Sequence, residues 1–99
     1  MIIRKLCNMP YAQAQIREYR KSEGCKRNYD ILQSYQTDVL MIDYDKCTVT
    51  CYGLYSRTTR KHISSFMREK GLDYSIAKKC YEENADYNFL DRKYIRAGA

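Results

Sequence analysis

The feature that most constrains this 99-residue chain is a pair of β-rich runs joined by a short turn. Residues 39–43 and 47–52 are rich in side chains that favour strands, and residues 44–46 join them. In the second run apolar and polar residues alternate, which is typical of a strand with one buried face. We therefore predict an antiparallel hairpin over residues 39–52, at the centre of a sheet spanning residues 31–55.

Helical signals stand on both sides of this hairpin. Pro10 suits a first helical turn and Gly24 suits a left-handed stop, so we predict a helix over residues 10–23. Apolar residues at helical spacing predict two further helices, over residues 58–70 and 74–84. The C-terminal tail beyond them is expected to be loose.

These elements predict a single domain over residues 1–99 of the α+β class. In this prediction a small antiparallel sheet of about three strands is covered by the N-terminal and C-terminal helices. Apolar runs stay well short of the roughly 20 residues that a membrane helix needs, so no membrane partner is expected.

The five cysteines match neither a disulfide framework nor a zinc motif. Their number is odd, and no two have the C-x-x-C spacing. Cys47 and Cys51 share a predicted strand and would lie about 13 Å apart, too far for a disulfide. We therefore expect reduced thiols in a cytosol, and we predict no metal and no cofactor.

The formal net charge of +6 is distributed unevenly along the chain. Residues 1–29 carry seven bases and two acids, and residues 57–72 carry five bases and one acid, whereas residues 30–56 carry one base and four acids. Two basic segments favour an acidic partner, either nucleic acid or an acidic protein surface. The predicted partner-binding bases are Arg17, Arg20, Lys21, Lys26, Arg27, Arg57, Arg60, Lys61 and Arg68.

The stretch from Gly53 to Gly71 carries the most specific site hypothesis. Thr58 and Thr59 stand where the predicted helix begins, and their hydroxyls can cap its first turn. Alternatively, the first-turn amides, the positive end of the helix dipole and the nearby bases would hold a phosphate. We predict an anion site at Thr58 and Thr59 on this ground.

His62, the only histidine of the chain, has two interpretations. It borders the apolar stripe of the predicted helix, where a histidine commonly packs and bonds a carbonyl or hydroxyl group. With Lys61, Arg60 or a tyrosine it has the residue types of a small metal-independent nuclease. The pattern is not specific to catalysis, so we predict no enzyme and no catalytic residue.

Two segments, SYQTDVLMID (34–43) and GLYSRTTRKHISSFMREKGL (53–72), resemble a small domain family of phages and mobile elements in gut-type Gram-positive bacteria. The pattern is S-Y-x-T, an I-D that ends a strand, then G-x-Y-S-x-T-T-x-x-H-I-x-x-F and a closing glycine, over roughly forty residues. The matching residues are Ser34, Tyr35, Thr37, Ile42, Asp43, Gly53, Tyr55, Ser56, Thr58, Thr59, His62, Ile63, Phe66 and Gly71.

The resemblance implies a phage or mobile-element accessory protein in a bacterial host cytoplasm, without an assigned activity. In that setting we expect a non-enzymatic inhibitor of a host nucleic-acid-based defence complex, of the anti-CRISPR type, that occludes the nucleic-acid path. The expected partner is a host ribonucleoprotein or another defence protein, and direct nucleic-acid contact and a homodimer both stay open. The alternatives are a DNA- or RNA-binding regulator and, third, the small nuclease.

Overall fold

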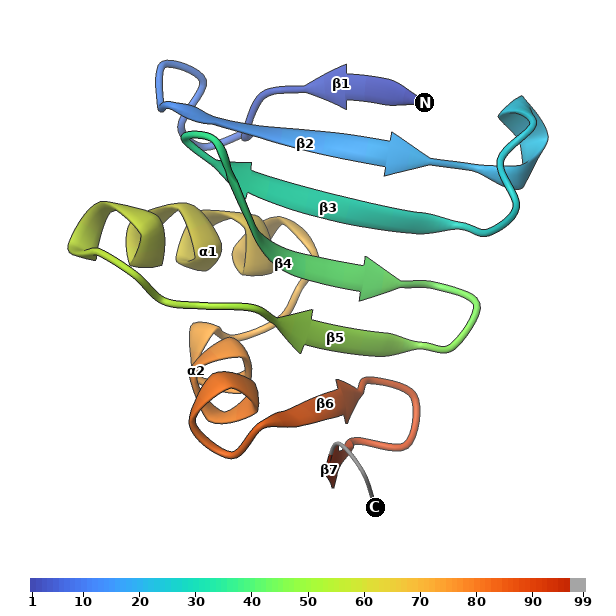
Figure 1. The fold of residues 1–99 in the computed structure, drawn as a ribbon, viewed down its shortest axis with the longest axis vertical. Coiled ribbons are helices and arrows are strands. Elements are labelled where there is room, and N and C mark those ends of the chain that lie inside the picture. Colours follow the sequence, from blue (N-terminus) through green and yellow to red (C-terminus); the bar gives the residue numbers. More distant parts are fainter. Residues whose placement is uncertain (97–99) are drawn as a thin grey trace.

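The computed structural model describes residues 1–96, and one seven-stranded antiparallel sheet dominates it (Figure 1). The strands lie in the sheet in the order of the chain, and each is antiparallel to its neighbours. They are β1 (Ile2–Arg4), β2 (Ala14–Tyr19), β3 (Tyr29–Ser34), β4 (Thr37–Asp43), β5 (Thr48–Cys51), β6 (Ala85–Asn88) and β7 (Lys93–Arg96).

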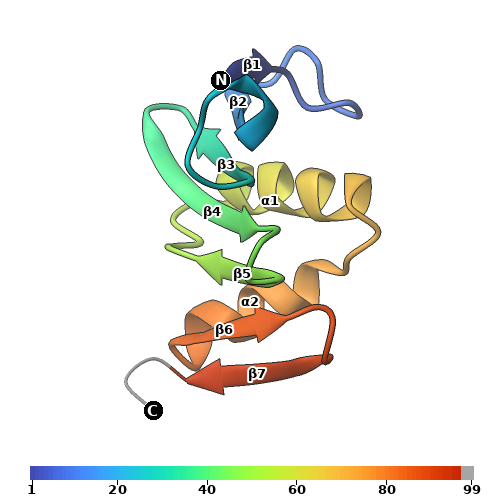
Figure 2. The same cartoon turned by 90° about the vertical axis from the view of Figure 1, so that its right-hand side faces the viewer.

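Two helices connect β5 to β6 and cover one face of the sheet. These are α1 (Arg57–Glu69) and α2 (Tyr74–Glu82). α1 packs on β3 and β4, and α2 packs on β5 and β6, on the same side of the sheet (Figure 2). The predicted helices over 58–70 and 74–84 are confirmed with slightly different ends. Neither helix of the described chain is long and apolar enough to cross a membrane.

The core lies between these helices and the covered face of the sheet. The predicted hairpin over 39–52 is confirmed as β4 and β5, and its alternating residues point into this core. The largest fully buried side chains from the sheet are Ile16, Leu32, Leu40 and Ile42, and those from α1 are Ile63, Phe66 and Met67.

The predicted N-terminal helix over residues 10–23 is wrong, because the middle of this segment, Ala14–Tyr19, forms β2. β2 pairs with β3 along its whole length, and this places the fully buried Ile16 opposite Leu32. Pairing with β3 and burial of Ile16 outweigh the helical spacing of the segment. Gly24, with a φ of 89°, does end a helical turn, but only the three-residue 3-10 turn η1 (Lys21–Glu23).

The predicted sheet of about three strands over residues 31–55 is also wrong, since strands on both sides extend it to seven. On the C-terminal side β6 and β7 form a hairpin in which Tyr87 lies opposite Tyr94, with ring centroids 4.9 Å apart. The tail is therefore ordered through Arg96, and its last residues, 97–99, lie outside the described part of the chain. The domain keeps the α+β class, but the sheet dominates and the helices cover one face only.

The tail was expected to be loose because the turn signal at Asn88, which joins β6 to β7, was missed. Asn88 Oδ1 accepts hydrogen bonds from the backbone N–H groups of Leu90 at 2.9 Å and Asp91 at 2.8 Å. Asparagine at the start of a turn commonly bonds the backbone in this way. Tyr87, Leu90 and Tyr94 have the spacing of one helix face along the sequence. This spacing does not reflect a helix, because Leu90 lies exposed in the turn.

Candidate functional site

The bases predicted to bind a partner fall into two groups. In the N-terminal segment most of them face acids across the sheet or the adjoining turns. The pairs outside the Asp30 region are Arg17–Asp38, Lys21–Asp45 and Arg27–Asp43, with N–O distances of 2.9, 3.4 and 3.0 Å. Lys26 is exposed and makes no ion pair within residues 1–96. The acids of residues 30–56 therefore neutralise much of the basic N-terminal segment.

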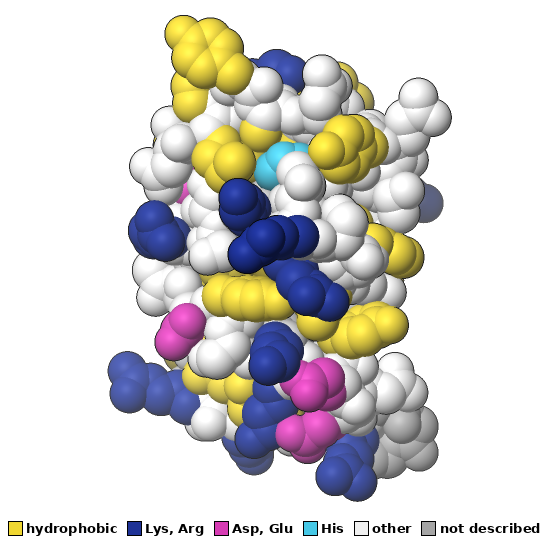
Figure 3. Space-filling view, turned by 90° about the vertical axis from the view of Figure 1, so that its left-hand side faces the viewer, with side chains coloured by type: hydrophobic (Ala, Val, Ile, Leu, Met, Phe, Trp, Pro, Cys, Tyr) yellow, Lys and Arg dark blue, Asp and Glu magenta, His cyan; other side chains and the backbone are white. Residues whose placement is uncertain are grey.

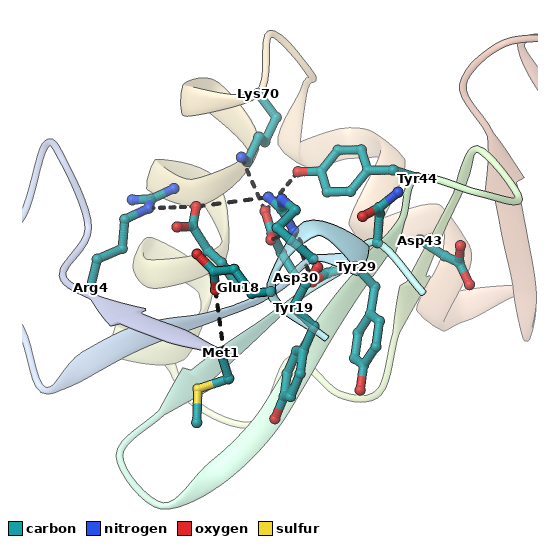
Figure 4. Close-up of polar contacts among 12 residues, drawn as sticks. Met1, Arg4, Glu18, Tyr19, Tyr29, Asp30, Asp43, Tyr44 and Lys70 are labelled. Atoms are coloured by element: carbon teal, nitrogen blue, oxygen red, sulfur yellow. Dashed lines mark hydrogen bonds and ion pairs between the residues drawn. The ribbon is translucent and has the colours of Figure 1, made fainter. Parts of the chain in front are cut away.

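Arg20 belongs to a partly buried cluster centred on Asp30, which lies on the covered face of β3. Figure 4 shows Asp30 together with Lys70 and Tyr44. Asp30 is 0% exposed, and its Oδ2 accepts a hydrogen bond from Tyr44 Oη at 2.7 Å. Lys70 Nζ lies 3.1 Å from the same oxygen, and Arg20 Nη1 lies 2.8 Å from Oδ1. One carboxylate thus holds the turn after β2, the end of β4 and the end of α1 together.

Arg20 neutralises Asp30 mainly through proximity. Its Nη1 donates to the carbonyl oxygens of Tyr19 at 2.8 Å and Tyr29 at 3.2 Å. Asp30 Oδ1 consequently accepts no well-aligned hydrogen bond, although the guanidinium lies beside it. The attraction between these two groups is therefore that of an ion pair in a low-dielectric site.

The pKa shifts show that this cluster is charged at neutral pH. Burial acts to raise the pKa of Asp30, but the hydrogen bond from Tyr44 and the nearby positive groups of Arg20 and Lys70 outweigh it and lower the pKa below its usual value. Burial acts to lower the pKa of Lys70, but Tyr44 and Asp30 raise it above its usual value. Burial, with Asp30 as the next cause, raises the pKa of Tyr44, which stays a neutral donor.

The cluster continues to β1 and forms what we call the ion network: Arg4, Glu18, Arg20, Asp30, Glu69 and Lys70, with Tyr44. Arg4 Nε lies 3.0 Å from Glu18 Oε2, and Arg4 Nη2 lies 2.9 Å from Glu69 Oε2. Glu69 also accepts a hydrogen bond from the backbone N–H of Cys7. Glu18 in turn lies 3.9 Å from Arg20. Three bases meet three acids, so the network carries no net charge and joins β1, β2 and β3 to the end of α1.

The second group of predicted bases lies on α1 and has no such partners. We call Arg57, Arg60, Lys61 and Arg68 the α1 basic stripe. At 3.6 residues per turn these four bases lie within an arc of about 100° around the helix axis, and all four are exposed. None of the four makes an ion pair within the described residues, and the single acid of α1, Glu69, is bonded to Arg4. In Figure 3, which faces the start of α1, Lys and Arg side chains gather beside the cyan His62.

The two residues of the predicted anion site differ in their surroundings. Thr58 is exposed in the first turn, whereas Thr59 is buried. Thr59 Oγ1 lies 3.1 Å from Ser56 Oγ and 3.2 Å from Ser34 Oγ, and its N–H donates to the Ser56 cap. Only Thr58 of this pair therefore has a side chain that an external anion can reach.

His62 lies directly below this cap and is 1% exposed. Its Nδ1 is 2.8 Å from Ser34 Oγ, and its ring centroid lies 5.8 Å from that of Tyr35. Burial lowers the pKa of His62, so the ring is neutral at neutral pH. Ser34 and His62 have the spacing of a nucleophile and its base, but both side chains are buried, and their contact joins α1 to the turn between β3 and β4.

The residues behind the S-Y-x-T and G-x-Y-S-x-T-T-x-x-H pattern thus share one structural task at the start of α1. Ser34, Thr59 and His62 form its buried polar cluster, and the exposed cap residue Ser56 bonds Thr59 from outside. Gly53 belongs to the same region, because a Cβ at this position would clash with the ring of Tyr55. The pattern therefore marks a packing arrangement of the domain.

The chain belongs to DUF8033, a family of unknown function. The family match spans residues 5–84, from the segment after β1 to the end of α2, and it includes the whole α1 basic stripe. No curated protein and no solved structure matches the chain. The prediction of a domain family without an assigned activity is confirmed.

Sequence reasoning missed Tyr44 and Lys70 as partners of Asp30. A signal was present, because Asp30, Leu32 and Ser34 occupy alternate positions and therefore share the covered face of β3. A carboxylate on a buried face requires positive or donating partners. The identity of those partners depends on strand order, which the sequence pattern did not reveal.

Proposed function

We propose that this protein is a non-enzymatic binding protein whose α1 basic stripe contacts the phosphate backbone of nucleic acid. The observation that supports it is the set of four exposed bases on one helix face without an acid partner in the described chain. Such side chains need not break an ion pair when a phosphate approaches, and their binding releases counterions from the nucleic acid. The paired bases of the N-terminal segment contribute less, because their charge is already neutralised.

Exposed aromatic rings near the stripe support the same proposal. Tyr35 is 53% exposed and Tyr55 is 64% exposed, and both lie next to the start of α1. Rings of this kind stack on unpaired bases, and together with cations they favour single-stranded nucleic acid. Thr58, exposed in the first turn between Arg57 and the buried Thr59, is the remaining candidate for an additional phosphate contact.

The finer proposal is that this nucleic acid belongs to a host defence ribonucleoprotein, whose path the protein occludes in a bacterial cytoplasm. It is supported by the resemblance to a domain family of phages and mobile elements. A free DNA- or RNA-binding regulator would use the same stripe. The two differ in one respect, because a regulator binds specific duplex DNA or RNA without any host protein.

The stripe is tested by fluorescence anisotropy with labelled single-stranded DNA, single-stranded RNA and duplex DNA across a salt series. The variant R57Q/R60Q/K61Q/R68Q is compared with the charge-matched control K26Q/K46Q/R92Q/K93Q, whose sites lie in or directly beside turns at the other end of the sheet (Figure 1). We expect the stripe variant to bind more weakly and to reduce the salt slope by about 0.7–0.9 for each lost phosphate contact. Equal losses in both variants would contradict the proposal.

The finer proposal is tested by measuring target binding by a purified CRISPR-type effector with its guide RNA, in the presence and absence of the protein. We expect the protein to reduce target binding by the effector, and the stripe variant to lose this effect while the control variant keeps it. Sequence-specific binding to free duplex DNA, with no effect on the effector, would favour the regulator instead.

A further inference from the structure

A hollow of about 230 Å³ lies between the loop that follows β1 and the exposed side of α1. We call it the Ser65 hollow. Its volume is below the roughly 300 Å³ at which pockets for drug-sized ligands begin, so a small group fits it better than a whole metabolite. It is lined by Asn8 and Met9 from the loop and by Lys61, Ser64, Ser65 and Arg68 from α1.

The polar side chains of this hollow have no protein partner. Five of its six residues carry polar side chains, and none of these makes a hydrogen bond or an ion pair to another residue among the described ones. Ser65 is the strongest evidence for a missing partner, because the residue is only 5% exposed and its Oγ is buried without a hydrogen-bond partner. Leaving a buried hydroxyl unpaired is costly, so a native protein seldom keeps one without a reason.

A second hollow shows that this lack of partners is a property of the site. It measures about 510 Å³ and is lined by Arg20, Asn28, Tyr44 and Lys70. There Tyr44 and Lys70 contact Asp30, and Asn28 bonds Asp45 and the backbone of Lys21. Its polar groups are occupied by the protein itself, so it offers a ligand much less than the Ser65 hollow does.

The donors of the Ser65 hollow match one chemical class of ligand. Lys61 and Arg68 carry positive charge, both serines and Asn8 can donate hydrogen bonds, and no carboxylate lines the site. Several donors around a doubly charged tetrahedral group are typical of phosphate recognition. We propose that the Ser65 hollow binds a single phosphoryl group, which, if the proposed function holds, belongs to the nucleic acid that the α1 basic stripe contacts.

Inorganic phosphate is the first probe, and amide chemical shifts of the ¹⁵N-labelled protein are the measurement. We expect a saturable shift confined to residues 8–9 and 61–68 that chloride at the same ionic strength does not produce. No saturable shift, or the same shifts with chloride, would overturn the proposal.

Variants separate binding in the hollow from diffuse attraction to basic residues. R68Q removes one charge from the hollow and should weaken phosphate binding about tenfold, as expected for a charge-assisted contact. K46Q removes the same charge from the turn between β4 and β5, outside both the hollow and the stripe, and should leave phosphate affinity unchanged. Equal effects of both variants would mean diffuse attraction and would overturn the proposal.

S65A tests whether the Ser65 hydroxyl serves phosphate binding or only the packing of the protein, because these two roles predict different changes in stability and affinity. Removing the unpaired buried hydroxyl should raise the melting temperature by up to about 4–8 °C, because the cost of its burial disappears. The same variant should weaken phosphate binding. A stabilised S65A protein that binds phosphate with unchanged affinity would exclude Ser65 from the site, and a destabilised one would contradict the unpaired hydroxyl.

Oligonucleotides with and without a terminal phosphate identify the source of the phosphoryl group and separate the two proposals. Tighter binding of the phosphorylated oligonucleotide, lost in R68Q but not in K46Q, would indicate a terminal phosphate. Equal binding of both, with equal loss in R68Q, would indicate an internal phosphodiester. If phosphate binds but no oligonucleotide does, the phosphoryl site in the hollow is supported and the proposed nucleic-acid function is contradicted. If oligonucleotides bind but phosphate shifts no residue of the hollow, the nucleic-acid function is supported and the phosphoryl site is contradicted.

Discussion

The ion network and the α1 basic stripe contain the same kinds of side chain in opposite surroundings. Arg4, Arg20 and Lys70 each face an acid, and the network has no net charge. The bases of the stripe face none within residues 1–96. The difference teaches that a count of bases along a sequence does not locate a binding surface, because pairing in space decides which charges stay available.

Strand geometry is the reason for the difference. β2, β3 and β4 lie side by side in the sheet. Acids of β3, of β4 and of the turn after β4 therefore come close to bases on β2 and on the segment that joins β2 to β3. A helix that lies on one face of the sheet has a solvent side with no neighbouring strand. Acids for its bases can therefore come only from the helix itself or from the loop beside it. Glu69, the acid of α1, is bonded to Arg4, and the loop over residues 5–13 contains no acid.

The largest expected effect comes from removing the centre of the network. Asp30→Ala leaves Arg20 and Lys70 without their carboxylate in a partly buried site, so it should lower the free energy of unfolding by about 3–5 kcal/mol. Asp38→Ala is the control, because its pair with Arg17 is more exposed and should matter by at most about 1 kcal/mol. Urea denaturation measures both, and equal losses would show that the network is no more structural than a surface pair.

The acid limb of stability tests the same network without mutation. The folded-state pKa values of Asp30 and Glu69 are lowered, so their contribution is complete above the unfolded values near about 3.9 and 4.3 and is lost as the pH falls through the folded values. We expect the melting temperature to fall steeply below this range. Glu69→Gln should flatten the limb, and an unchanged curve would argue against a charged Glu69–Arg4 pair.

His62 offers a smaller test on the side of the molecule that lacks acids. Its folded-state pKa is lowered by burial, so the stability due to the neutral ring is complete above the unfolded value near about 6.5 and is lost as the pH falls through the folded value. The melting temperature should therefore decline between about pH 7 and pH 5. Because the chain has one histidine, His62→Gln should remove this decline, and a persistent decline would assign it to another group.

The smallest effect on stability is expected for the stripe itself. R57Q/R60Q/K61Q/R68Q breaks no ion pair among the described residues and relieves repulsion between bases one helical turn apart, worth about 0.2–0.5 kcal/mol for each pair. The free energy of unfolding should stay the same or rise slightly. A loss comparable to that of Asp30→Ala would mean that the stripe is structural, and the contrast between the two regions would fail.

Local signals along the sequence were enough for the elements whose ends are determined by their own residues. Asp73 caps α2, which begins at Tyr74 as predicted. α1 begins at Arg57, one residue before the predicted start, because Ser56 supplies the cap in place of Thr58 or Thr59. The hairpin of β4 and β5 followed from its β-rich runs and turn, and the exposure of the α1 bases followed from the apolar stripe on the opposite side of the helix. A helix cap, a tight turn and an amphipathic stripe each involve residues close in the chain.

Tertiary structure alone decided the N-terminal segment, the tail and the pairing of charges. The segment around Ile16 fits either a helical stripe or an alternating strand, and β3 as a pairing partner selects the strand. Tyr87 and Tyr94 fit a helix by spacing, but they meet across a hairpin. Asp30 contacts Arg20, Tyr44 and Lys70 because the fold brings distant segments together. These outcomes depend on which strands become neighbours, a long-range choice that no local pattern encodes.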